Sequence, residues 1–207
     1  GHRLALLQLE TGLEPAAAAP QDPWSALFRA GWLARKGSAE EAEPILAGLP
    51  PAVRAIPSVR RLAEWAQGEV LLAKGSTAEA LERFAAAAPE PGKAESVEVA
   101  HLAGFLVERA SRAHLGAGRF PEAEALLERL GRTSAWFVLG AGALHAAQVR
   151  SGYDEARCLE ERGDRARSIE AYARFLRRWS TPDPAAPEVE EALRRYAGLA
   201  GSPWKPG

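Results

Sequence analysis

Apolar side chains recur at spacings of three and four residues along most of the chain. This period places them on one face of an α-helix, and the strict alternation typical of strands is scarce. Glycines and prolines fall between the periodic segments, where they end and begin helices. The pattern predicts an all-α fold with helices over residues 3–11, 23–36, 38–48, 57–74, 76–88, 95–116, 119–131, 134–162, 164–179 and 187–199. Gly140, Gly142 and Gly152 weaken 134–162, so two helices there are an alternative.

Four segments repeat one pattern around a glycine: Gly37, Gly75, Gly118 and Gly163. The residue five positions later is small in each: Ala42, Ala80, Ala123 and Ser168. A large residue stands four positions beyond it: Leu46, Phe84, Leu127 and Tyr172. Another small residue lies seven positions before each glycine: Ala30, Gly68, Ser111 and Ala156. Glycine permits the left-handed turn that ends a helix, and the small residues let two helices approach closely. Each unit is therefore predicted to be an antiparallel helical hairpin.

The segments CLEERGDRARSIEAYARFL and GEVLLAKGSTAEALERFAAAAPEP resemble the tetratricopeptide repeat. The four glycines stand 38, 43 and 45 residues apart, and these spacings exceed the ~34 residues of the standard repeat. The difference implies lengthened first helices or longer connections. The resemblance implies a right-handed α-solenoid of about four hairpins over residues 23–180. An N-terminal helix and a Pro/Ala linker are expected over 1–22, and a capping helix and tail over 181–207.

In tetratricopeptide arrays the first helices line a concave groove, at positions ten and six residues before the turn glycine. The resemblance places these residues there: Leu27, Gly31, Trp65, Glu69, Glu108, Arg112, Tyr153 and Arg157. It implies a groove for a protein or peptide partner, with these candidate contacts: Trp65, Glu69, Glu108, Arg112, Tyr153 and Arg157. Trp65 and Tyr153 are candidate aromatic anchors. Burial of both in an irregular stack is the alternative, and for Trp65 the two interpretations have equal weight.

Two sets of substitutions separate core from groove in this interpretation. Gly68→Leu is expected to unfold the second hairpin by overpacking. Tyr153→Ala and Arg157→Glu are expected to leave thermal stability nearly intact and to weaken binding.

The charge balance narrows the classes of partner. Lys and Arg number 26 against 27 Asp and Glu, so the formal net charge is −1. No global field attracts nucleic acid or an anionic membrane. No run of 18 apolar residues is present, so membrane insertion is not expected. The predicted partner is a protein or peptide.

Catalytic and metal-binding motifs are absent from the sequence. The four histidines form no H-E-x-x-H pair, the single cysteine, Cys158, forms no C-x-x-C motif, and the glycines form no phosphate-binding loop. We predict a chain without enzymatic activity, cofactor or metal. The basic stretch GDRARSIEAYARFLRRW is interpreted as an ordinary helix, in which Asp164 favours the start and Arg177 and Arg178 favour the end.

The context of the chain is a separate expectation. The sequence lacks methionine, which favours a piece of a longer protein. The stretch from Gly163 resembles the carboxyl end of bacterial multidomain proteins that include receptor-like serine/threonine kinases. An alternative function is therefore a sensor or regulatory segment of such a signalling enzyme, in contact with other domains of its own parent chain. One cysteine favours a reducing, cytoplasmic setting, and an extracytoplasmic segment of a membrane-anchored parent is the alternative.

Overall fold

The computed structural model describes residues 22–90, 97–132, 141–178 and 187–205, and every element in these ranges is a helix. The helices are α2 (Pro23–Arg35), α3 (Ala39–Ala47), α4 (Pro51–Arg54), α5 (Pro57–Ala73), α6 (Thr77–Ala87), α7 (Val97–Gly116), α8 (Phe120–Arg132), α9 (Ala141–Glu161), α10 (Arg165–Arg178) and α11 (Pro187–Ala200). The all-α prediction is confirmed for these ranges. Helix α9 is continuous through Gly152, the short α4 was not predicted, and the predicted helix 3–11 lies outside the described residues.

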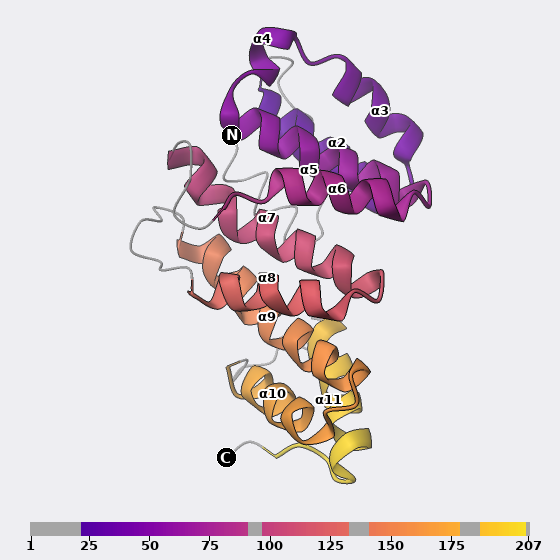
Figure 1. Ribbon diagram of the computed structural model, residues 1–207, viewed down its shortest axis with the longest axis vertical. Coiled ribbons are helices and arrows are strands. Elements are labelled where there is room, and N and C mark those ends of the chain that lie inside the picture. Colours follow the sequence, from indigo (N-terminus) through magenta and orange to yellow (C-terminus); the bar gives the residue numbers. More distant parts are fainter. Residues whose placement is uncertain (1–21, 91–96, 133–140, 179–186, 206–207) are drawn as a thin grey trace.

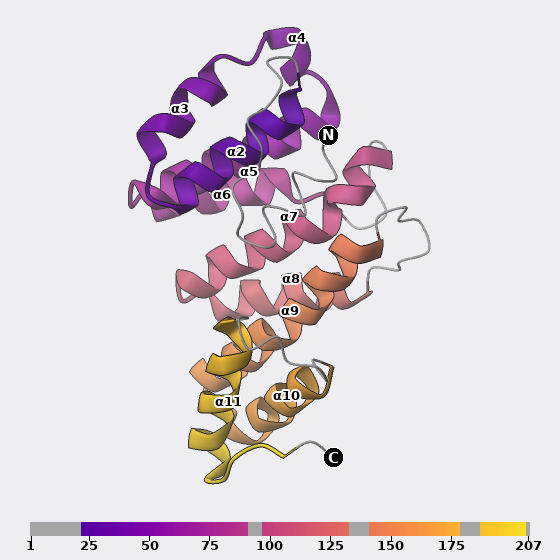
Figure 2. The same ribbon diagram turned by 180° about the vertical axis from the view of Figure 1, so that it is seen from behind.

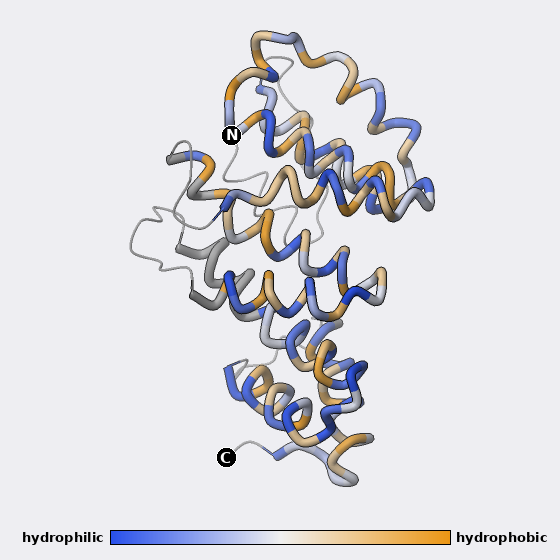
Figure 3. Tube along the Cα trace, in the orientation of Figure 1, coloured by the Kyte–Doolittle hydropathy of each residue, from blue (hydrophilic) through white to orange (hydrophobic). Residues whose placement is uncertain are grey.

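Helices α5 to α10 follow one another in chain order along the long axis of the molecule, and α3 and α4 lie beyond α2 at one end (Figure 1). Neighbours in sequence pack together, as in the pairs α5 with α6, α7 with α8 and α9 with α10. Helices that are not neighbours in sequence also pack, as α2 does with α5 and α7 with α9. Seen from behind, α11 runs more nearly along the long axis and crosses α9 (Figure 2). Hydrophobic and hydrophilic residues are interspersed along the described helices, as expected for amphipathic helices that pack through one apolar face (Figure 3).

Four helices end in the same glycine turn. Gly37, Gly75, Gly118 and Gly163 have φ values of +88°, +82°, +72° and +77°. At each turn the backbone N–H of the next residue donates to the carbonyl oxygen five positions earlier, with an N···O distance of 2.9 Å in all four cases. This is the Schellman arrangement, which satisfies carbonyl groups that the helix end leaves open. The glycine turns predicted from the sequence are confirmed.

The small residues of the repeated pattern lie where pairs of helices approach most closely. Ala42, Ala80, Ala123 and Ser168 are fully buried. A Cβ atom on Gly68 would lie 3.0 Å from Cζ of Phe84, so nothing larger than glycine fits without displacing that ring. The Ser168 hydroxyl donates to the carbonyl of Ala156 across the α9–α10 pair, with an O···O distance of 2.9 Å. The close approach predicted at Gly68 is therefore present.

The apolar core of the described residues falls into separate clusters. The largest runs from α2 to α8 and includes Phe28, Trp65 and Phe105. A second joins α9, α10 and α11 around Tyr172 and Phe175. A third, small cluster lies between them: Leu115, Ala123, Leu127 and Cys158. Among the described side chains, fewer buried apolar residues therefore join α7 to α9 than form the cluster on either side.

Helix α10 carries charged residues at its two ends, as the sequence suggested for an ordinary helix: Asp164 precedes it, and Arg177 and Arg178 lie in its last turn. Asp164 caps it, since the Arg167 N–H donates to Oδ1 of Asp164 over an N···O distance of 3.3 Å. Tyr172, Phe175 and Leu176 are buried on one face. Among the helices that the structure describes, none is both long enough and apolar enough to span a bilayer.

Candidate functional site

We call the helices that precede the four glycine turns (α2, α5, α7 and α9) the first helices, and those that follow the turns (α3, α6, α8 and α10) the second helices. Trp65 is the centre of an aromatic contact between the first helices α2, α5 and α7. Its ring lies 5.9 Å from Phe28 on α2 and 4.9 Å from Phe105 on α7, measured between centroids, and its side chain is 0% exposed. The indole Nε1–H donates to Oε1 of Glu69 at an N···O distance of 3.0 Å. A Cβ atom on Gly31 would lie 2.1 Å from Cη2 of Trp65. The glycine at that position of α2 therefore makes room for the indole of α5.

Ion pairs join α5 to α7 beside these rings and join α7 to α9 further along the stack. Oε1 of Glu69 on α5 lies 2.7 Å from Nη2 of Arg109 on α7. Glu108 on α7 accepts two hydrogen bonds from Arg150 on α9, at 2.8 Å from Nε and 3.1 Å from Nη2. Paired bonds of this kind hold an arginine and a carboxylate in one fixed orientation. The first helices are thus joined side chain to side chain.

Arg112 is the hub of this network. Its Nε lies 2.9 Å from Oδ2 of Asp154 on α9, and its Nη2 lies 3.4 Å from Oε1 of Glu188 on α11. Its Nε also lies 3.5 Å from Oε1 of Glu108, one turn away on α7. One side chain therefore connects three helices.

The pairs follow the register of the repeat. Glu69 stands six residues before its turn glycine and Arg109 nine residues before the next one. Arg112 and Asp154 occupy the same two positions one unit later, with the signs of charge reversed. Equivalent positions therefore meet at successive contacts, and the sequence changes only their chemistry.

Burial and ion pairing shift the pKa values of these charged side chains in opposite directions. Burial, the largest influence, would raise the pKa of Glu108, but Arg112 and Arg150 outweigh it and hold that pKa below its ordinary value. Burial also raises the pKa of Asp154, and Arg112 offsets this only in part. Burial lowers the pKa of Arg112, but Asp154 and Glu108 reverse this and raise it. At all three side chains, ion pairing favours the charged form and opposes the effect of burial.

Most of the predicted groove residues have little surface to offer a partner. Trp65, Glu69, Glu108 and Tyr153 are at most 4% exposed. Of the two interpretations of Trp65, burial in the stack describes this structure. Arg112 has a side chain 23% exposed and is engaged by carboxylates from α7, α9 and α11. Arg157 is half-buried and forms no hydrogen bond or ion pair with the residues described.

Tyr153 is buried in the stack, which is the alternative to its role as an exposed anchor. Its ring lies 6.1 Å from Tyr172 and 5.7 Å from Phe175, and its hydroxyl has no hydrogen-bond partner within the described ranges. Burial, with Glu191 nearby, raises the pKa of this hydroxyl. Tyr153→Ala would leave a cavity, so the expectation that it leaves stability intact does not fit the structure.

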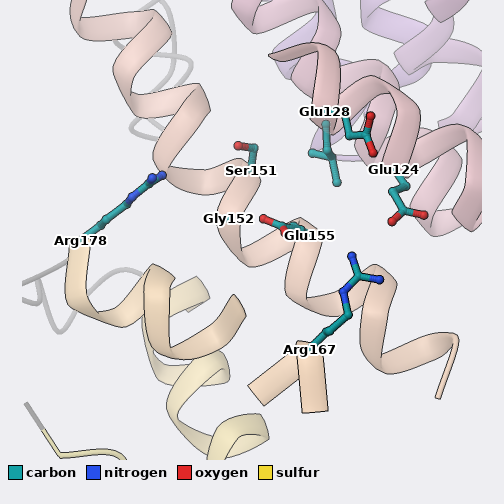
Figure 4. A pocket seen from close by; sticks show the side chains of 8 residues that line it. Glu124, Glu128, Ser151, Gly152, Glu155, Arg167 and Arg178 are labelled. Atoms are coloured by element: carbon teal, nitrogen blue, oxygen red, sulfur yellow. The ribbon is translucent and has the colours of Figure 1, made fainter. Parts of the chain in front are cut away.

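A hollow of about 360 Å³ lies between α8, α9 and α10. We call it the α8–α10 cleft (Figure 4). Its lining residues are Glu124, Leu127, Glu128, Ser151, Gly152, Glu155, Arg167 and Arg178. The acids Glu124 and Glu128 come from α8, and Arg167 and Arg178 come from α10. The two walls therefore carry opposite charge, and Ser151 and Gly152 of α9 lie between them.

Sequence reasoning missed this cleft. It treated Gly152 only as a weak point of a helix and the arginines of α10 only as charges that suit that helix. Two signals were present, namely Glu124 and Glu128 one turn apart and a glycine in the middle of a long first helix. Neither signal specifies which helix faces which, because that depends on how the second helices stack.

Within the residues that the structure describes, no group of three or more His, Cys, Asp or Glu side chains is placed to hold a metal ion. Comparisons with models of protein families, with curated proteins and with solved structures find no match to this chain.

Proposed function

We propose that the chain is a non-enzymatic scaffold that binds a protein or peptide partner, built as a right-handed solenoid of tetratricopeptide-like hairpins. Four turns with the same glycine conformation and the same hydrogen bond support this architecture. Buried small residues at equivalent positions on both sides of each turn support it as well. An array of this kind offers extended surfaces on either side of its stack of helices.

The observation that carries the proposal is the opposite charge of the two walls of the α8–α10 cleft. In contrast, the first helices use the expected groove positions for contacts with one another, through Trp65, Glu69 and Glu108. We therefore assign the first helices to the rigid spine of the scaffold and partner binding to the cleft between second helices.

The test is capture of partners from the source lysate on three immobilised forms of the chain. The first is the wild type, the second is Arg167→Glu with Arg178→Glu, and the third is the control Arg177→Glu. Arg177 is exposed on the same helix but does not line the cleft, so the control makes the same kind of charge change elsewhere. We expect a saturable partner with the wild type and the control, and its loss with the double variant. Equal retention by all three forms, or no saturable partner, contradicts the proposal.

A further inference from the structure

Glu124, Glu155 and Arg167 form their ion pairs with residues that do not line the α8–α10 cleft. Glu124 pairs with Arg162, which does not line this hollow. Oε1 of Glu155 pairs with Arg174 at 2.8 Å from Nη2. Arg167 pairs with Asp164, three residues away on its own side. In the described ranges Arg178 forms no ion pair. The acids of α8 and the arginines of α10 therefore face the same hollow without closing it (Figure 4).

The middle of the cleft is open because α9 presents Gly152 there. A Cβ atom on Gly152 would lie 3.8 Å from the Cβ of Phe175, in ordinary van der Waals contact with that buried residue. The backbone of α9 at Gly152 therefore forms part of the lining of the cleft.

The length of the arginine wall sets the size of a matching ligand. Arg167 and Arg178 lie eleven residues apart on α10. At 1.5 Å per residue this corresponds to about 16 Å along the helix. An extended peptide rises about 3.3 Å per residue, so about five residues span the same distance.

The charges of the walls then specify the order of residues in such a peptide. Successive side chains of an extended backbone point to opposite sides. A segment lying along the cleft directs one set toward Glu124 and Glu128 and the other set toward Arg167 and Arg178. A uniformly basic segment would meet the arginines, and a polyanion such as nucleic acid would meet the glutamates.

We propose that the α8–α10 cleft binds an extended peptide segment of about five or six residues in which basic and acidic side chains alternate. The inference rests on the proposed function, since it assigns the sequence pattern of the partner at the same site. The basic side chains contact Glu124 and Glu128, and the acidic side chains contact Arg178 and Arg167.

The first test compares two peptides of identical composition. One is the alternating acetyl-KEKEKE-amide and the other is the block peptide acetyl-KKKEEE-amide. Both have no net charge, so only the order of residues differs. We expect the alternating peptide to bind at least about tenfold more tightly at low salt, with affinity falling as salt is added. Amide shifts in an NMR titration should centre on Ser151 and Gly152. Equal affinity for the two peptides, or shifts centred elsewhere, overturns the inference.

Two variants make the test specific to the cleft. Arg167→Glu with Arg178→Glu makes both walls acidic, so it should lose the alternating Lys–Glu peptide and prefer an alternating Lys–Gln peptide. Arg177→Glu should behave like the wild type. Undiminished binding of the Lys–Glu peptide by the double variant overturns the inference.

The outcomes also separate this inference from the proposed function. If the double variant loses the captured partner but the wild type does not distinguish the two peptides, the proposed function stands and the alternating pattern is wrong. If the captured partner is retained by the double variant, both are wrong.

Discussion

The two halves of the stack solve the same packing problem with different chemistry. Helices α2, α5 and α7 meet through the rings of Phe28, Trp65 and Phe105, beside the ion pair of Glu69 with Arg109. Helices α7, α9 and α11 meet through ion pairs centred on Arg112. Helix α7 belongs to both, because it supplies Phe105 to one side and Arg112 to the other. The repeated register fixes where neighbouring units touch, and the residues at those positions decide how.

The difference has consequences for stability. Aromatic burial is favourable without strict geometry and grows with the area removed from water. Buried ion pairs must recover the large cost of removing charge from water, which they do only with good geometry and complete pairing. The N-terminal contacts should therefore be sensitive to lost volume and the C-terminal contacts to a lost partner.

Removal of the central ring should have the largest effect. Trp65→Ala deletes a fully buried side chain that contacts both α2 and α7, and such truncations cost about 3–5 kcal/mol. Urea unfolding measures the loss. Trp204, which packs on the second cluster and is only partly buried, provides the control, and Trp204→Ala should cost clearly less. Equal losses in the two variants contradict the central place given to Trp65.

Removal of one ionic partner should have a similar effect, but one that a second substitution relieves. Arg150→Leu leaves the buried carboxylate of Glu108 without its paired donor, which costs about 3–5 kcal/mol for a buried pair. Glu108→Leu with Arg150→Leu removes both charges and should restore most of that stability. Urea unfolding measures both variants. If the double variant is less stable than Arg150→Leu, the unpaired carboxylate of Glu108 is not the cause of the loss.

A smaller steric effect tests the fit between α2 and α5. Gly31→Ala places a methyl group inside the volume of the Trp65 indole and should cost about 1–3 kcal/mol. Gly31→Ala in a Trp65→Leu background should cost much less, because the smaller side chain makes room. A double-mutant cycle by thermal unfolding gives the coupling, and additive losses would contradict the fit.

Alkaline pH should destabilise the C-terminal half through its cysteine and its tyrosines. The chain's cysteine and all three of its tyrosines lie at or beyond residue 153. Burial raises the pKa of Cys158 from 9.0 to about 12, and burial with the Glu160 hydrogen bond raises the pKa of Tyr172. Because the folded-state pKa is raised, the stability is present below pH 9 and is lost as pH rises toward 12.

For Cys158 the loss by pH 11 is on the order of 3 kcal/mol, at about 1.4 kcal/mol for each of the two pH units above its unfolded pKa of 9.0. Hydrogen exchange at rising pH, corrected for intrinsic rates, should show α9 and α10 opening before α2 and α5. Cys158→Ala should reduce the effect. Simultaneous opening of all helices contradicts the prediction.

The elements of the fold were readable from the sequence because their causes are local. Apolar spacing, glycine turns and small residues such as Ala80 and Gly68 act between two helices that are neighbours in sequence, and nearly all helix ends agree to within about two residues. The chemistry of the contacts between helices far apart in sequence was not readable. Glu69 and Arg109 are 40 residues apart, and their pairing depends on how α5 and α7 lie relative to each other. The resemblance therefore placed Trp65 and Tyr153 in an open groove, whereas the stack buries both.

The central claim is that equivalent positions of the repeated pattern join α2, α5 and α7 chiefly through aromatic rings and join α7, α9 and α11 through ion pairs centred on Arg112. Its most direct test is hydrogen exchange, followed by mass spectrometry, on Arg112→Ala. This variant removes the hub of the ionic contacts and leaves Trp65 and its neighbours untouched. We predict lost protection in α9 and α11 with unchanged protection in α2 and α5. An even loss of protection across all four helices would contradict the claim.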